Sequence, residues 1–250
     1  MKNNFYTLIA SIPVIIIWYV LSSIAPHYLL PYPHEVGFAL INLFLNKDLL
    51  ENLIISLFRV FIGFLTGIAL GILLGIAILI SGILKKLFYP IISFIIVIPT
   101  FVFIPLLMVW IGLNDFLPIS AVIICTSFPL IHSLTSASKS ISQEMIDDAI
   151  ISGADNMELI RKIILPLSLS HIAPILRIEA GHSWRIVFVT EFLALPNGLG
   201  ALMMRSYSLL KIDEMLALVI LIGFLALVYQ LIIEKIESIF LRKWGRNVRL

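Results

Sequence analysis

Charged residues are scarce in this chain of 250 residues, and their scarcity limits what the chain can be. Only 13% of the residues are Asp, Glu, Lys or Arg, whereas 60% are hydrophobic and the mean hydropathy is +1.09. Soluble domains carry about 25% charged residues. Because so few charges cannot cover a water-facing surface, a soluble enzyme is excluded, and we expect an all-α chain that folds in a lipid bilayer.

Cysteine and the common catalytic motifs are also missing or nearly so. The single cysteine, Cys125, allows no intrachain disulfide. The chain has no G-x-x-x-x-G-K-[ST] loop for nucleotide phosphates, no H-E-x-x-H and no G-x-S-x-G. Glu179 and His182 have the spacing of a metal-binding pair, but no second pair exists, so we expect no metal. A net charge of +2 gives no reason to expect a nucleic-acid partner.

Stretches without charge predict the membrane crossings. Five such stretches, each long enough for a helix of about 20 residues, cover residues 3–34, 60–84, 87–114, 116–138 and 215–233. The run from Phe5 to Ile24 is longer than the core of a secretory signal, so we expect it to be retained as the first span. A sixth candidate, about Ile172 to Leu195, is apolar but interrupted by charges.

The distribution of basic residues favours counting this polar segment as a span. With six spans and a cytoplasmic N-terminus, 11 of the 17 Lys and Arg residues lie on the cytoplasmic side and three lie outside. Such a bias follows the positive-inside rule. Without the sixth span, the basic tail from Arg242 to Arg249 would lie outside. We therefore predict about six spans with both termini in the cytoplasm.

Glycines in the second predicted span and prolines in the third predict how these helices pack and bend. Gly63, Gly67, Gly71 and Gly75 line one face of the second span, where they allow close approach of another helix, either within the chain or across a subunit interface. Pro99 and Pro105 lie in the third span, where we expect them to kink the helix.

The polar loop from Lys139 to about Ser170, between the fourth and fifth spans, predicts two short amphipathic helices. Gly153 separates them, Asp155 is expected to cap the second, and Pro166 is expected to end it. The loop is acidic rather than basic, so anionic lipid would repel it and docking to a protein is favoured over lying on the membrane. Its acidic residues include Glu144, Asp147, Asp148, Asp155 and Glu158.

The spacing in this loop resembles a known signature. Asp147-Asp148-Ala149, three residues, Gly153, nine residues and then Ile163-Ile164-Leu165-Pro166 are similar to the EAA motif of permease subunits in binding-protein-dependent ABC importers. The departure is Asp-Asp-Ala in place of Glu-Ala-Ala. Over about residues 30–245, the chain resembles the nitrate/sulfonate/taurine type of permease within that family. Further matches are Ser56-Leu57-Phe58-Arg59-Val60, Ile98-Pro99, Trp110-Ile111-Gly112 and Gly198-Leu199-Gly200.

This resemblance implies a single transmembrane permease domain over residues 1–250 with a coupling-helix elbow in the loop 139–170. It also implies a permease homodimer in the cell membrane, two cytoplasmic ATPase subunits that bind the ATP, and an extracytoplasmic binding protein that delivers a small solute. The chain itself would be no enzyme and hold no cofactor. The residues expected to couple it to the ATPase are Asp147, Asp148, Ala149, Gly153, Ala154, Asp155, Leu165 and Pro166.

Ionisable residues at membrane depth predict the translocation path. Such groups are expensive in lipid and face a cavity, the bundle interior or a partner. The alternative is that they form fixed ion pairs that only hold the bundle together. The candidates are Arg59, Arg177, Glu179, His182, Trp184, Arg185 and Glu191.

Two other functions stay open at this point. The chain could be a secondary transporter with Glu179, His182 and Glu191 as a proton relay, or a membrane enzyme with its site in the fifth span. Neither would need the acidic elbow. The sequence does not indicate the solute, because Glu179 and Glu191 offset the arginines.

Overall fold

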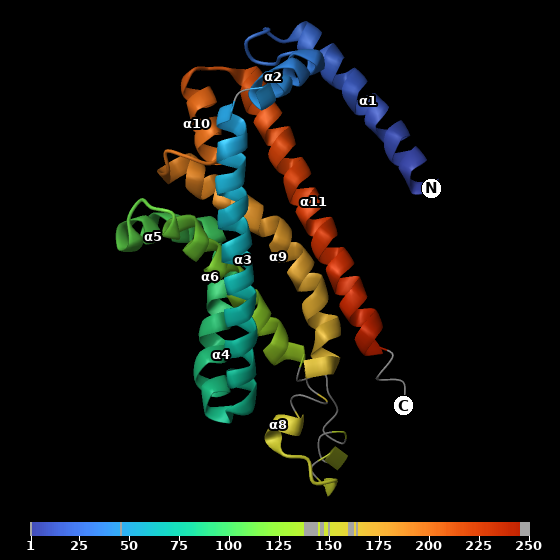
Figure 1. The fold of residues 1–250 in the computed structure, drawn as a ribbon, viewed down its shortest axis with the longest axis vertical. Helices are drawn as coiled ribbons and strands as arrows, with labels where there is room; N and C mark the ends of the chain where they lie inside the picture. Colours follow the sequence, from blue (N-terminus) through green and yellow to red (C-terminus); the bar gives the residue numbers. More distant parts are fainter. Residues whose placement is uncertain are drawn as a thin grey trace. The chain divides into compact units, whose positions relative to one another are not determined.

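The structure, a computed structural model, is helical wherever it is regular in the residues it describes: 2–45, 47–137, 145, 148–149, 151–159, 163 and 165–245 (Figure 1). This confirms the all-α prediction. The elements are α1 (Lys2–Ile24), α2 (Pro33–Leu45), α3 (Lys47–Ile80), α4 (Gly82–Val97), the 3-10 turn η1 (Thr100–Val102), α5 (Phe103–Ile111), α6 (Phe116–Ala137), α8 (Asn156–Leu159), α9 (Leu165–Ala194), α10 (Leu199–Ser208) and α11 (Ile212–Gly245).

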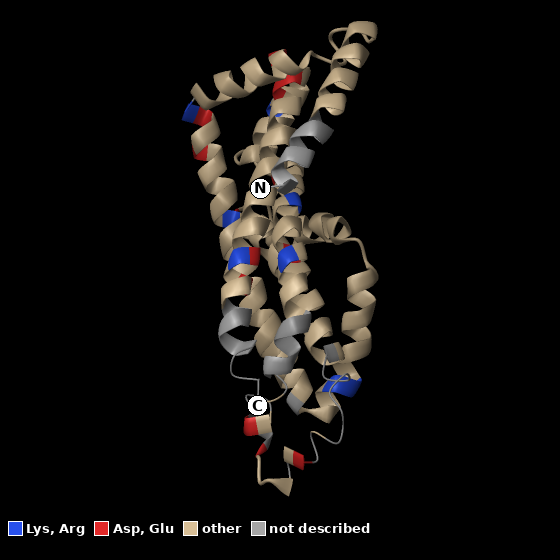
Figure 2. Cartoon of the chain, turned by 90° about the vertical axis from the view of Figure 1, so that its right-hand side faces the viewer, with Lys and Arg blue, Asp and Glu red and all other residues tan. Residues whose placement is uncertain are grey.

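Three described helices, α3, α6 and α11, are long and apolar enough to cross a membrane. Two bent pairs, α4 with α5 and α9 with α10, bring the number to five if each pair is one span. Figure 2 shows long stretches of helix without Lys, Arg, Asp or Glu. The described apolar part of α1, Ile12–Ile24, is shorter. The sixth crossing and the orientation of the termini therefore stay predictions.

The chain divides into two compact units, each made of segments distant in sequence. The first unit comprises Met1–Ser56 and Glu191–Phe224, and the second comprises Leu57–Thr190 and Leu225–Leu250. In the first unit, α2 packs on the start of α11 through Val36, Ala39 and Ala217. The Trp18 indole of α1 donates a hydrogen bond to the Pro31 carbonyl at 3.1 Å, which ties α1 to the segment before α2.

The glycine face of α3 packs against α6 within the second unit. A Cβ atom added to Gly63, Gly67, Gly71 or Gly75 would lie 2.7, 2.8, 2.9 or 2.6 Å from the nearest side-chain atom of α6. The partners repeat every four residues as well, so the two helices interdigitate along matching rows. The intrachain alternative for this face is therefore confirmed. The four α6 partners are Val122, Thr126, Leu130 and Leu134.

The third predicted span is broken rather than kinked, which corrects the expectation from the sequence. α4 ends at Val97, and its C-cap Ile98 is extended, with φ −73° and ψ 126°. A residue before proline disfavours the helical region, so Pro99 stops the helix. The following segment turns by 95°. Pro105 lies in the first turn of α5, where no intrahelical N–H bond is lost.

Candidate functional site

The elbow turns at Gly153, as predicted. Gly153 has φ +85°, and the N–H of Ala154 donates to the carbonyl of Ala149 at 3.0 Å across the turn. This bond over five residues, with glycine in the left-handed region, is a Schellman motif that ends the first short helix. Nothing lies within 4 Å of a Cβ built on Gly153, so its backbone angle, not space, requires the glycine.

Asp155 begins the second short helix, which confirms its predicted capping role. Its Oδ1 accepts a hydrogen bond from the N–H of Glu158 at 2.6 Å at the start of α8. At the end of the first short helix, the side chain of Ile151 is 83% exposed, and Asp148 and Asp155 are also exposed. The elbow thus exposes an apolar side chain that lies between two exposed carboxylates in the sequence. Asp147 and Glu144 lie outside the described residues.

The prediction that Pro166 ends the second short helix is wrong. Pro166 lies inside the described part of α9, which runs on to Ala194, so no helix ends at this residue. Residues 160–162 and 164 lie outside the described part of the chain. The end of the EAA-like motif thus belongs to the long polar helix, and the elbow precedes it in the sequence.

Arg177 takes part in fixed ion pairs. Its Nε and one terminal nitrogen bond the two carboxylate oxygens of Glu237, each at 2.8 Å, and its other terminal nitrogen lies 3.2 Å from Glu234. Both acids belong to α11. This two-pronged geometry fixes both the position and the plane of the guanidinium. Arg177 therefore fits the structural alternative rather than the path.

Arg59 and Trp184 are also enclosed in the second unit. The Arg59 side chain is 1% exposed, and its Nε donates to Asp115 at 3.1 Å. Trp184 is 2% exposed, and its indole nitrogen has no hydrogen-bond partner among the described residues.

Glu191 is fully buried in the first unit, where it closes the turn between α9 and α10. Its carboxylate lies 2.8 Å from the hydroxyl of Ser56 and accepts from the N–H of Gly200 at 3.1 Å. The same hydroxyl accepts from the N–H of Leu199 at 2.9 Å. The N–H of the residue before, Gly198, donates to Asn52 Oδ1. Three successive N–H groups at the start of α10 thus have side-chain partners.

The sequence analysis assigned no role to Asn52 and included Ser56 only as part of a family pattern. The Gly198-Leu199-Gly200 run was the available signal for this turn. Gly198 has φ +104°, and a Cβ built on it would lie 2.2 Å from the Glu191 carboxyl carbon. Only glycine fits beside a carboxylate this close.

A cavity of about 330 Å³ in the second unit brings together two of the seven path candidates. His182 and Arg185 of α9 form its polar side, next to Ile186 and Val189. Residues that follow the break at Pro99 form the other wall: Thr100, Phe101 and Ile104.

Glu179 is not among the residues that line this cavity. It is 6% exposed, and its Oε2 lies 3.5 Å from Nδ1 of His182. Arg185 is exposed and has no ion-pair partner among the residues that the structure describes.

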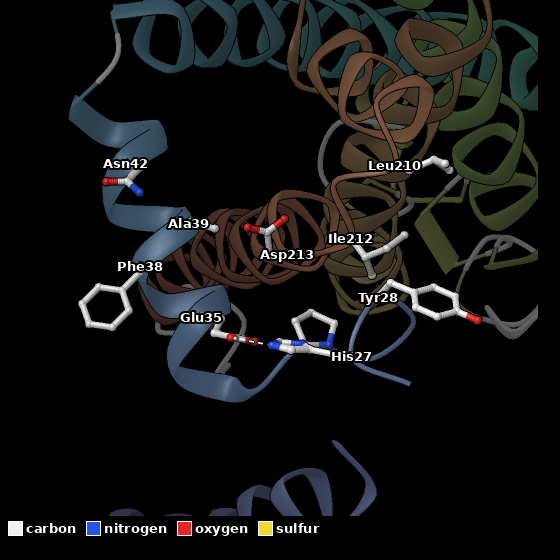
Figure 3. Close-up of a pocket in the computed structure, with 10 residues that line it drawn as sticks. His27, Tyr28, Glu35, Phe38, Ala39, Asn42, Leu210, Ile212 and Asp213 are labelled. Carbon is white, nitrogen blue, oxygen red and sulfur yellow. Dashed lines mark ion pairs between the residues drawn. The ribbon is translucent and has the colours of Figure 1, made fainter. Parts of the chain in front are cut away.

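A second cavity, of about 370 Å³, belongs to the first unit (Figure 3). Glu35 and Asp213 contribute carboxylates to it, and Asn42 contributes an amide. Glu35 pairs with His27 at 3.0 Å, and this pair is marked in Figure 3. Nearby Lys211 is bound by Glu214 at 2.7 Å, and this hydrogen bond raises the pKa of Lys211. Asp213 has no hydrogen bond or ion pair to another described side chain.

The structure offers no candidate metal site in the parts of the chain that it describes, because no three His, Cys, Asp or Glu side chains come together there.

Comparison with known proteins identifies the family. Residues 67–245 match the model of the binding-protein-dependent transport system inner membrane component family. A putative ABC transporter permease protein of Methanocaldococcus jannaschii is 32% identical over 192 residues, which cover 76% of this chain and 72% of the relative. The taurine transport system permease protein of Escherichia coli K12 is 26% identical over 223 residues, 86% of this chain and 81% of that protein.

Solved structures share the fold. A bacterial ABC transporter involved in the import of the acidic polysaccharide alginate matches with a TM-score of 0.65 and 19% identity, over 95% of this chain and 96% of that one. The inward-facing MetNI methionine ABC transporter matches with a TM-score of 0.56 and 20% identity, over 77% and 94%. The chain therefore belongs to the family of binding-protein-dependent transport system inner membrane components and is a permease subunit of an ABC importer.

Proposed function

We propose that this permease moves a small solute that an extracytoplasmic binding protein delivers, and that a separate cytoplasmic ATPase drives the movement through the elbow around Gly153. ATP is bound by the ATPase, and the permease needs no cofactor of its own. Two copies of the permease form the path, and both termini of each copy lie in the cytoplasm. The bilayer is the only other partner required.

The construction of the elbow is the observation that carries this proposal. The Schellman turn at Gly153 and the Asp155 cap satisfy the backbone groups where the chain reverses, so the elbow holds its shape with local hydrogen bonds. The exposed Ile151 supplies an apolar anchor, and the acidic residues beside it favour a basic rim on the partner. A shaped elbow just ahead of α9 can pass a rigid-body push to that helix.

A secondary transporter with a proton relay through Glu191 has no observation in its favour. The Glu191 carboxylate is occupied by Ser56 and the N–H of Gly200. It therefore has a structural task in the turn before α10. Glu179 and His182 remain as one isolated pair.

The test is a pair of substitutions at Gly153 in the complete transporter. Gly153→Val forces a β-branched residue into the left-handed region, whereas Gly153→Asn places there the residue type that tolerates this region best. We expect Gly153→Val to reduce ATP-dependent uptake at least about tenfold and to weaken co-purification of the ATPase, and Gly153→Asn to retain most of both. Membrane insertion should be unchanged.

Gly82→Val is the matched control. Gly82 also has nothing within 4 Å of a built Cβ but has no positive φ, so its replacement should leave uptake unchanged. Normal uptake and ATPase association in Gly153→Val would refute the proposed coupling role of the elbow.

A further inference from the structure

The turn between α10 and α11 contains the one non-glycine residue with a positive φ in the part of the chain that the structure describes. This residue, Leu210, has φ +55° and follows Leu209, the C-cap of α10. The N–H of Leu210 donates to the carbonyl of Tyr207 at 3.0 Å, and the N–H of Lys211 donates to the carbonyl of Ser206 at 3.0 Å. These two bonds form a Schellman motif, in which glycine is the usual residue at the position of Leu210.

Leucine at this position costs free energy that packing within the chain does not return. In the left-handed region its Cβ lies too close to the following carbonyl oxygen, a strain that glycine avoids. The Leu210 side chain is 77% exposed, so it gains little from burial within the described structure. Backbone strain of this kind is concentrated at functional sites. An apolar contact with another molecule would account for a leucine here.

Leu210 lines the acidic cavity of the first unit. Figure 3 shows Leu210 and Tyr28 on one side of this cavity and Phe38 on the opposite side, with Asp213 between them in this view. Leu210, Tyr28 and Phe38 are all exposed, so large side chains with apolar surface surround one carboxylate. Aromatic rings and a carboxylate attract the same kind of group, a cation.

The other charged side chains around this turn are already paired. They line a smaller cavity of about 150 Å³ in the same unit. There Arg205 lies 3.3 Å from Asp48, and Lys211 lies 2.7 Å from Glu214. Asp213 thus remains the carboxylate at this turn without such a partner among the described side chains.

We propose that Leu210 and Asp213 form a docking surface for the extracytoplasmic binding protein. Leu210 is its apolar anchor, and Asp213 receives a basic side chain of the partner. The inference rests on the proposed function and its topology, in which the turn between α10 and α11 lies on the outer side. In this contact the permease supplies the acid, and the binding protein supplies the base and an apolar surface next to it.

Two other occupants fit this surface less well. Anionic lipid headgroups would place like charges next to Asp213, which has no paired base among the described side chains. A second copy of the chain would bring the same surface to itself under two-fold symmetry, so acid would approach acid. A separate protein with a basic group meets neither difficulty.

The test uses a substitution for which the proposal predicts no loss of stability but a loss of docking. Leu210→Gly removes both the backbone strain and the anchor. Its melting temperature should equal or exceed that of the wild type, because glycine suits this turn. In the complete reconstituted transporter, the binding-protein concentration that half-stimulates ATPase activity should rise about tenfold, as expected when an interface loses a buried leucine. Leu210→Met keeps an apolar side chain and should stay within about twofold of the wild type.

Leu45→Gly is the matched control. Leu45 is 78% exposed, belongs to the same unit and does not line the cavity, so its replacement should leave the half-stimulating concentration unchanged. The proposal is overturned if Leu210→Gly leaves this concentration unchanged, or if Leu45→Gly or Leu210→Met shifts it equally. It is also overturned if Leu210→Gly melts below the wild type, because Leu210 would then stabilise its own chain.

Failure of the docking surface can be told apart from failure of the transport function. If the wild-type ATPase responds to the binding protein and Leu210→Gly responds equally well, the docking surface is wrong and the proposed function stands. If the wild-type ATPase responds to a binding protein at no concentration, the proposed function itself fails.

Discussion

The carboxylate of Glu191, near the end of α9, accepts a hydrogen bond from the backbone N–H of Gly200, in the first turn of α10, at 3.1 Å. A carboxylate at a helix N-terminus satisfies a free donor and interacts favourably with the helix dipole. Since Ser56 and Asn52 of α3 bond the two preceding N–H groups, the turn is fixed from two helices at once. This arrangement makes the α9–α10 turn a rigid corner of the first unit.

The first prediction concerns Gly198 in this corner. Gly198→Ala would place a methyl group 2.2 Å from the Glu191 carboxyl carbon at a φ of +104°. The backbone angle alone costs about 1–3 kcal/mol, and the clash displaces a buried carboxylate as well. We expect the purified variant to have a clearly lower melting temperature than the wild type. Intrinsic fluorescence recorded during heating measures this temperature.

The control for this prediction is Gly82→Ala, which has open space around its Cβ and an ordinary φ. A second variant, Ser56→Ala, keeps the backbone but leaves the Leu199 N–H unpaired, at a cost of about 1–3 kcal/mol. If Gly198→Ala melts at the same temperature as Gly82→Ala, Glu191 does not hold the corner in the way described.

The second prediction ranks two glycines of the α3 face. A Cβ on Gly67 would meet Thr126 Cβ at 2.8 Å and the backbone of Ile123 at 3.3 Å, which cannot move easily. A Cβ on Gly75 would meet Leu134 Cδ1 at 2.6 Å, which is the end of a flexible side chain. We expect Gly67→Ala to destabilise by about 1–3 kcal/mol and Gly75→Ala by less.

Thermal unfolding of the two variants in detergent decides between these expectations, with the double variant Gly75→Ala/Leu134→Ala as a check. Shortening Leu134 should remove the clash at Gly75. Equal melting temperatures for Gly67→Ala and Gly75→Ala would show that α3 and α6 separate instead of repacking locally.

The sequence predicted these local features well because each depends on neighbouring residues. A glycine every fourth residue defines a face, and Gly153 followed by Asp155 defines a turn and a cap within the loop itself. Pro99 and Pro105 show the limit. Both residues carry the same local signal, and only the surrounding chain decides that Pro99 breaks the span whereas Pro105 lies in the first turn of α5.

The polar residues of α9 were found from the sequence but could not be sorted by role. Helical spacing predicts which of them share a face, yet their partners come from distant segments: Glu237 for Arg177, and Ser56 for Glu191. No spacing rule identifies such contacts. The division into ion-paired, turn-forming and cavity-lining residues therefore required the three-dimensional arrangement.

The third prediction separates the two acids that bind Arg177. Glu237 bonds it through both oxygens and is 8% exposed, whereas Glu234 makes one contact and is 48% exposed. Exposed ion pairs contribute little, and two-pronged enclosed ones contribute more. We expect Glu237→Gln to lower the melting temperature clearly and Glu234→Gln to leave it nearly unchanged.

Both variants should keep wild-type uptake per folded transporter if Arg177 is structural. ATP-dependent uptake by the reconstituted transporter, divided by the amount of folded protein, measures this. Lower uptake in Glu237→Gln at unchanged stability would place Arg177 in the translocation path.

The fourth prediction concerns the acidic cavity of the first unit and its role toward the binding protein. Lys211 is paired with Glu214, and Glu35 contacts His27, so Asp213 is left as the carboxylate of this cavity without such a partner among the described side chains. On the predicted topology this cavity opens on the outer side, where a basic side chain of the binding protein would find it. Asp213→Asn should therefore raise the binding-protein concentration that half-stimulates ATPase activity by about three- to tenfold, because loss of one interface charge slows association.

The comparison variant is Glu51→Gln. It removes an exposed negative charge from the same structural unit, and Glu51 does not line the cavity. It should shift the half-stimulating concentration much less. High salt should reduce the difference between wild type and Asp213→Asn, since screening over about 8–10 Å already weakens such contacts near physiological ionic strength. Equal shifts for Asp213→Asn and Glu51→Gln would mean that the binding protein responds only to net charge, and the cavity would then have no part in docking.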